Sequence, residues 1–185
     1  LKGKSGWCST ICPLLPVQRI YGQTPLLIVA NAHCQPCVGC VKNCYDFNPK
    51  VAFLADVHDG DRQWSTTRKL FTAASPGLII AFFTGPEGGA AGEHYARLAL
   101  AVAASAGSFV ALEALTPVSV PRLAAVYAAA AINLFYWWAA PGPDWVAWPL
   151  RAAVLVLSVV WLRRTFTAER RFLERQGVPS PPRAA

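Results

Sequence analysis

The sequence predicts two parts: a small loop-rich N-terminal domain with short helices, followed by an all-α bundle of about four transmembrane helices. Of the 185 residues, 54% are hydrophobic and 15% are charged, and the apolar excess is concentrated after Leu70. All 6 cysteines precede that point, in a polar stretch rich in Gly, Pro and Asn without sustained helical periodicity. We therefore divide the chain into 1–69, 70–163 and a basic C-terminal helix and tail, 164–185.

The N-terminal segment contains a closely spaced run of cysteines in the stretch "HCQPCVGCVKNCYDFNP". Its C-x2-C-x2-C-x3-C spacing is that of bacterial ferredoxins, in which thiolates hold a [4Fe-4S] cluster, and it is formed by Cys34, Cys37, Cys40 and Cys44. His33 and Lys42 would tune the cluster or offset its negative charge. Zinc and disulfides are the alternatives, but zinc sites more often use two separated pairs and a cytoplasm is reducing. The prediction is thus a ferredoxin-like iron-sulfur domain.

A second cysteine pair lies in "GWCSTICP", where Cys8 and Cys12 are followed by Pro13. Because the fourth cysteine of one run can ligate another cluster in two-cluster ferredoxins, Cys12 competes with Cys44 as the fourth ligand. Two complete clusters need eight cysteines. The pair is therefore either a redox or structural pair beside one cluster, or part of a second cluster whose other ligands lie outside this chain. Because the sequence has no Met, we expect further residues before Leu1.

Four apolar segments follow, at about 70–86, 96–118, 121–140 and 145–163. The second and third are long enough for a hydrocarbon core of roughly 30 Å, which needs about 20 residues. The first contains Pro76 and is short unless it borrows Thr66 to Lys69, and the fourth carries Arg151. Either of these two could instead be a kinked or interfacial helix. Core helices of a soluble protein are the alternative for the whole bundle.

The formal charge of +7 is best explained by membrane topology, because the cations flank apolar runs and form no stripe suited to nucleic acid. If all four segments span, the cysteine domain, Arg122 and the arginines after residue 162 share one side. The positive-inside rule makes that side cytoplasmic. An aromatic belt would mark the opposite face, formed by Tyr136, Trp137, Trp138, Trp145 and Trp148. We expect an integral protein of a bacterial inner membrane, with its cluster domain and C-terminus cytoplasmic.

Polar residues inside the apolar segments are candidates for ligand contact. Asn133 and Arg151 fall at similar depths if the last two helices are antiparallel, so they could hydrogen-bond to each other or hold a quinone or lipid headgroup. The alternative for Arg151 is a position at the interface beside Trp148, with the helix beginning only at Pro149. Glu113 lies nearer the other face, too far away to pair with Arg151.

The "GWC-x3-CP" element and the ferredoxin-type run, joined to membrane helices with basic edges, resemble the NosR, NapH and CcoG group of membrane-bound iron-sulfur proteins. The resemblance covers roughly residues 3–49. It implies electron passage between quinol or cytoplasmic donors and periplasmic or metal-handling acceptors, or assistance in cofactor assembly. By position, the four clustered cysteines match the cluster run, and Cys8 and Cys12 match the membrane-proximal motif. The chain departs from the group in having one ferredoxin run instead of two and four helices after it.

These observations leave two main functions: a membrane-anchored [4Fe-4S] electron carrier, or an accessory subunit in which the cluster is mainly structural. A reductase for metal-cofactor maturation is a narrower alternative. Haem is not expected, because none of the 3 histidines is central to an apolar run. The expected partners are lipid, other subunits of a redox complex, and a quinone or a soluble ferredoxin-type carrier docking on Lys42, Lys50 and Arg62. We expect a carrier subunit, not a stand-alone catalyst.

Overall fold

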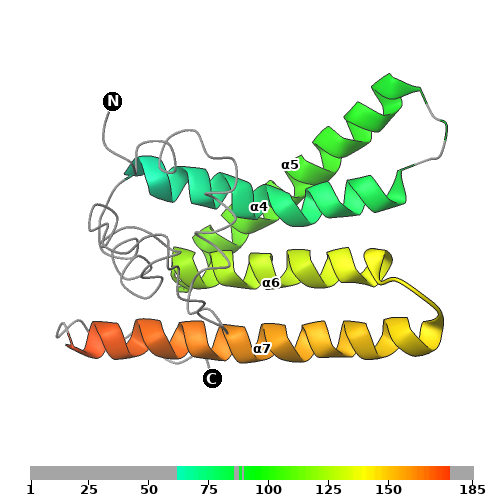
Figure 1. Cartoon of the computed structure of the whole chain (residues 1–185). Helices are drawn as coiled ribbons and strands as arrows, with labels where there is room; N and C mark the ends of the chain where they lie inside the picture. Colours follow the sequence, from blue (N-terminus) through cyan, green and yellow to red (C-terminus); the bar gives the residue numbers. More distant parts are fainter. Residues whose placement is uncertain (1–61, 86–87, 89, 176–185) are drawn as a thin grey trace, which may run out of the picture. The chain divides into compact units, whose positions relative to one another are not determined.

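The computed structural model describes residues 62–85, 88 and 90–175, and this part of the chain is all α-helix. Its four helices are α4 (Arg62–Thr84), α5 (Ala91–Leu115), α6 (Val120–Ala139) and α7 (Asp144–Arg175) (Figure 1). They confirm the predicted all-α region, whereas the predicted cysteine domain lies outside the described residues. Residues 69–163 form one structural unit with the greater part of every helix; residues 62–68 and 164–175 belong to another.

Two of the helices extend beyond the apolar segments that predicted them. α4 begins at Arg62, so it includes the stretch from Thr66 to Lys69 that the first segment needed. α7 runs without interruption to Arg175, because the Arg, Ala and Glu residues after the apolar run are good helix formers and nothing there stops the helix. The expectation that α7 begins at Pro149 is wrong, since the helix starts at Asp144 and includes the proline.

α4 and α5 are antiparallel partners. Near the start of α4, the Lys69 ammonium pairs with the carboxylate of Glu113 close to the end of α5. One turn further along α4, the Ser105 hydroxyl of α5 donates a 2.6 Å hydrogen bond to the carbonyl oxygen of Ala73. Glu113 thus has a partner on α4, in agreement with the expectation that it does not pair with Arg151.

The two backbones come closest at Gly77. A Cβ atom added to this glycine would lie 2.7 Å from the carbonyl carbon of Ala101 and 2.9 Å from Cβ of Ser105. Real Cβ atoms almost never approach other atoms so closely, so the glycine is required for this crossing. In membrane proteins, small residues allow helices to approach in this way.

α6 contacts both α4 and α5 through aromatic rings. Phe83 near the end of α4 stacks on Trp138 near the end of α6, with ring centroids 5.6 Å apart. Phe109 of α5 meets Tyr127 of α6 edge to face at 4.9 Å. Since the C-terminal ends of α4 and α6 meet, these two helices are parallel, and α5 is antiparallel to α4.

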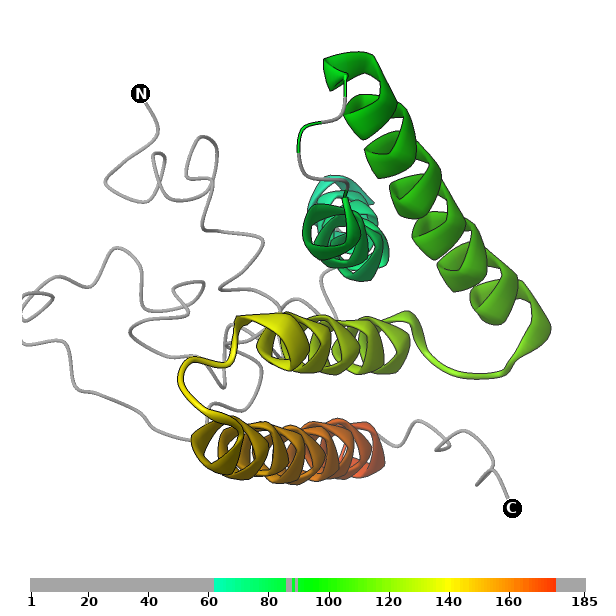
Figure 2. The same ribbon diagram turned by 90° about the vertical axis from the view of Figure 1, so that its right-hand side faces the viewer.

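α6 and α7 are antiparallel neighbours in residues 120–163, side by side in Figures 1 and 2. Their contact includes a 2.8 Å hydrogen bond from Asn133 to Ser158. α6 is also rich in buried alanines, which permit close packing on its neighbours: Ala124, Ala125, Ala128, Ala129 and Ala131. α6 therefore contacts each of the other three helices, and each helix is antiparallel to the next one along the chain.

The surface of this unit is unusually apolar. Exposed large hydrophobic side chains occur on every helix, including Phe82 at 70%, Leu100 at 72% and Val156 at 60% exposure. Ala91–Leu115 and Asp144–Arg171 are long and apolar enough to cross a membrane, and only 6% and 17% of their most apolar windows are buried. A core helix of a soluble protein would be mostly buried, so the low burial of these two helices makes them candidate membrane spans.

Candidate functional site

The predicted iron-sulfur site lies outside the described residues. This applies to Cys34, Cys37, Cys40 and Cys44, to the pair Cys8 and Cys12, and to His33 and Lys42. Within 62–85, 88 and 90–175, no group of three His, Cys, Asp or Glu side chains is placed to hold a metal ion. The candidate sites that the structure does describe are therefore the polar groups among the apolar helices.

Asn133 and Arg151 are both at the α6–α7 contact, but they bond to different partners. The Asn133 side-chain amide donates to the carbonyl oxygen of Ala129 at 2.7 Å and to Ser158 Oγ at 2.8 Å. Ser158 in turn donates to the carbonyl oxygen of Val154 at 2.8 Å. Both amide hydrogens of Asn133 are thus used within the protein, and one of the two bonds joins α6 to α7.

Arg151 is held between two tryptophans. Its guanidinium carbon lies 5.1 Å from the ring centroids of both Trp137 and Trp148, within the range of cation–π attraction. Its Nη2 donates a 2.8 Å hydrogen bond to the carbonyl oxygen of Trp137 at the end of α6. Arg151 thus lies beside Trp148, the neighbour that the interfacial alternative gave it. Its buried Nε lacks a hydrogen-bond partner among the described residues.

Aromatic residues gather around Arg151, where α6 ends and α7 begins. Trp137 and Trp148 meet edge to face at 5.8 Å, and Trp145 is 77% exposed at the start of α7. α4 contributes Phe83, which stacks on Trp138. Tryptophan is favoured where an apolar region meets water, because its ring is apolar and its N–H is polar. The arrangement has the composition of the predicted outer aromatic belt.

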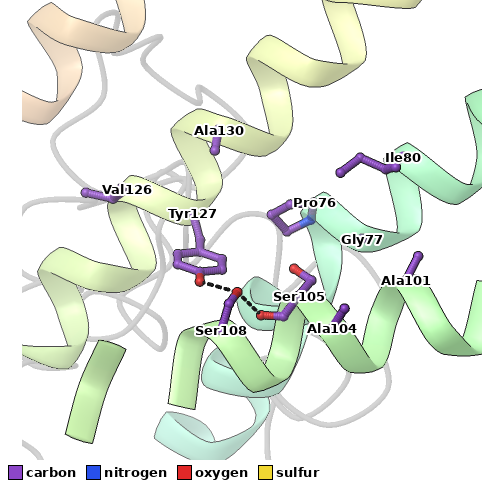
Figure 3. Close-up of a pocket in the computed structure, with 10 residues that line it drawn as sticks. All are labelled: Pro76, Gly77, Ile80, Ala101, Ala104, Ser105, Ser108, Val126, Tyr127 and Ala130. Atoms are coloured by element: carbon purple, nitrogen blue, oxygen red, sulfur yellow. Dashed lines mark hydrogen bonds between the residues drawn. The ribbon is translucent and has the colours of Figure 1, made fainter. Parts of the chain in front are cut away.

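A groove with a volume of about 430 Å³ lies among α4, α5 and α6. Figure 3 shows its walls: Pro76, Gly77 and Ile80 from α4, Ala101, Ala104, Ser105 and Ser108 from α5, and Val126, Tyr127 and Ala130 from α6. Several wall residues are exposed, Val126 by 42% and Ile80 by 39%, so the groove opens at the apolar surface of the unit. Its size and mainly apolar lining with a few polar groups are typical of small-molecule sites.

The polar part of the groove consists of three hydroxyls, of which those of Ser108 and Tyr127 are bonded to each other. Ser105 donates to the Ala73 carbonyl oxygen at 2.6 Å, and Ser108 donates to the Ser105 carbonyl oxygen at 2.7 Å. Ser108 Oγ also lies 2.7 Å from Tyr127 Oη (Figure 3). A hydroxyl has one hydrogen to donate. Since Ser108 gives its hydrogen to Ser105, the hydrogen in the remaining bond must come from Tyr127.

Comparison with models of known protein families, with characterised proteins and with solved structures found no match. The class that the described residues define is an all-α unit of four helices, two of them long and apolar enough for a membrane.

The groove was missed when the sequence was considered alone. Its signal was present in Ser105 and Ser108, which are three residues apart on one face of an otherwise apolar helix. The third hydroxyl belongs to Tyr127, which lies in an alanine-rich segment. The sequence could not indicate that these hydroxyls converge, because that depends on how α5 and α6 pack.

Proposed function

We propose that this chain is a membrane-anchored [4Fe-4S] protein that relays electrons to or from a larger membrane redox complex. The observation that carries the proposal is the C-x2-C-x2-C-x3-C run from Cys34 to Cys44 in a chain that also has two helices of membrane-spanning length. A bound cluster would supply single-electron chemistry. The helices would hold it at the membrane surface, within reach of a quinone pool or of partner subunits.

The proposed topology has all four helices crossing the membrane, with the cysteine segment and the C-terminus in the cytoplasm. Supporting it, the alternating directions of the helices bring the ends near Lys69, Arg122 and Arg163 to one side and the tryptophan cluster to the other. Lys69, Arg122 and Arg163 on one side and an aromatic belt on the other follow the positive-inside rule, with Arg97 and Arg151 as the cations nearer the aromatic side. A bacterial inner membrane is the setting that fits this pattern.

The test of the cluster is metal analysis and electron paramagnetic resonance of anaerobically purified protein. We expect iron and sulfide in a ratio that fits one [4Fe-4S] cluster, and its loss when Cys34, Cys37 or Cys40 is changed to Ser. Separate Cys12→Ser and Cys44→Ser variants identify the fourth ligand. Zinc in place of iron would refute the proposal.

An accessory role is the second candidate function, favoured by the large apolar surface of the helices. Phe82 and Leu100 are more than two-thirds exposed, which suits contact with partner subunits as well as lipid. In this role the cluster would mainly stabilise the N-terminal segment. Electron flux through membranes that carry cluster-ligand variants separates the accessory role from the relay, because the relay needs a redox-active cluster and the accessory role does not. A maturation reductase, the narrower alternative, would also need a redox-active cluster.

A further inference from the structure

The hydroxyls in the groove leave acceptor positions that nothing described in the structure uses. The single hydrogens of Ser105, Ser108 and Tyr127 are all donated, as shown above. Tyr127 Oη and Ser105 Oγ donate but receive no hydrogen bond from the described residues, so their lone pairs remain free. The ring is held in place by Phe109 at 4.9 Å. A ligand in the groove would therefore need a hydrogen to donate.

The rest of the groove offers no donor in its place. Pro76 has no backbone N–H, and the other wall residues are helical, so their amides are committed to helix bonds. The non-hydroxyl walls are apolar side chains. A ligand with only carbonyl oxygens, such as an oxidised quinone, could accept a hydrogen bond only if Tyr127 or a serine gave up the bond that it makes now. A ligand with a hydroxyl would find a free acceptor.

If α5 crosses the membrane, the groove lies too deep for the headgroup of an ordinary phospholipid. Ser105 lies ten residues before Leu115, the last residue of α5, which is ~15 Å along the helix. Phosphate groups remain at the membrane surface, whereas an isoprenoid-type lipid with a ring enters the hydrocarbon region. The volume of about 430 Å³ is large enough for such a ring and the start of its tail.

We propose that the groove among α4, α5 and α6 binds a quinol, whose ring hydroxyl donates a hydrogen bond to Tyr127 Oη, and that it prefers the quinol to the oxidised quinone. The inference rests on the proposed electron-transfer function, for which a quinol is a lipid-soluble partner. It adds the place of binding, the contacting atom and the redox form that binds.

The test uses the full chain in lipid nanodiscs and a photoreactive azido-quinol kept reduced, with the labelled residues identified by mass spectrometry. We expect labels on the groove residues of α4, α5 or α6, displaced by excess decylubiquinol. Oxidised decylubiquinone should displace them several-fold less well. Tyr127→Phe should weaken displacement by decylubiquinol about twofold to tenfold, the effect of one neutral hydrogen bond, and reduce the preference over the quinone. Tyr136→Phe on the same helix is the matched control and should change neither.

A second variant blocks the groove by volume. Ala130 is an exposed wall residue, so Ala130→Phe should abolish specific labelling without disturbing the buried contacts, whereas Ala111→Phe at an exposed position outside the groove should not. Labels elsewhere, full labelling of Ala130→Phe, equal displacement by quinone, or equal displacement by cholesterol would each overturn the inference. Labelling does not require the cluster, so its failure leaves the iron analysis unaffected, and loss of the cluster leaves labelling intact.

Discussion

The close crossing of α4 and α5 at Gly77 makes a prediction whose magnitude follows from the structure. In Gly77→Ala, the new Cβ would lie under 3 Å from the Ala101 carbonyl carbon, so the backbones must separate. Overpacking of this kind costs about 1–3 kcal/mol. Alanine also favours the helix over glycine by about 1 kcal/mol, which offsets part of that cost. The net expectation is a loss of up to about 2 kcal/mol.

Gly107→Ala on α5 separates the two effects, because a Cβ there would meet nothing within 4 Å. This control has the same gain in helix propensity and no overpacking, so it should stabilise the protein slightly. The difference in unfolding free energy between the variants should be about 1–3 kcal/mol, the packing contribution alone. The assay is reversible unfolding by dodecyl sulfate in mixed micelles, followed by circular dichroism. Equal stabilities for the two variants would refute the close contact of α4 and α5.

Three further predictions concern polar contacts and topology. A double-mutant cycle with Asn133→Leu and Ser158→Ala should give a coupling of about 0.5–1.5 kcal/mol in the same unfolding assay, and no coupling would contradict the α6–α7 hydrogen bond. Lys69→Met should destabilise by about 1 kcal/mol, because it leaves the Glu113 carboxylate unpaired; the double variant with Glu113→Leu should recover part of this loss, and additive losses would argue against the pair. A cysteine placed at Ala90 should react with an impermeant thiol reagent from the periplasmic side, as read by mass spectrometry of the labelled peptide; reaction from the cytoplasmic side alone would reverse the proposed orientation.

The four helices of the described residues could be predicted from the sequence because the apolar runs are separated by segments that contain Gly or Pro. Their ends were less predictable. An apolar run marks only the part of a helix that has an apolar surface, whereas the helix itself continues through polar residues that favour helix. α7 therefore passes Arg163 and reaches Arg175. The equal-depth argument for Asn133 and Arg151 failed because packing sets the register. Ser158 lies opposite Asn133, seven residues beyond Arg151, or ~10 Å along α7.

The central position of α6 has a consequence for how the protein enters a membrane. α5 and α7 are long and apolar enough to cross a membrane, whereas α6, with Arg122, Asn133 and its aromatic residues, does not meet the same standard among the described helices. Its buried alanines gain their contacts only when neighbouring helices are present. If the four helices cross a bilayer, α6 should enter it less readily by itself than together with α5, which precedes it in the chain.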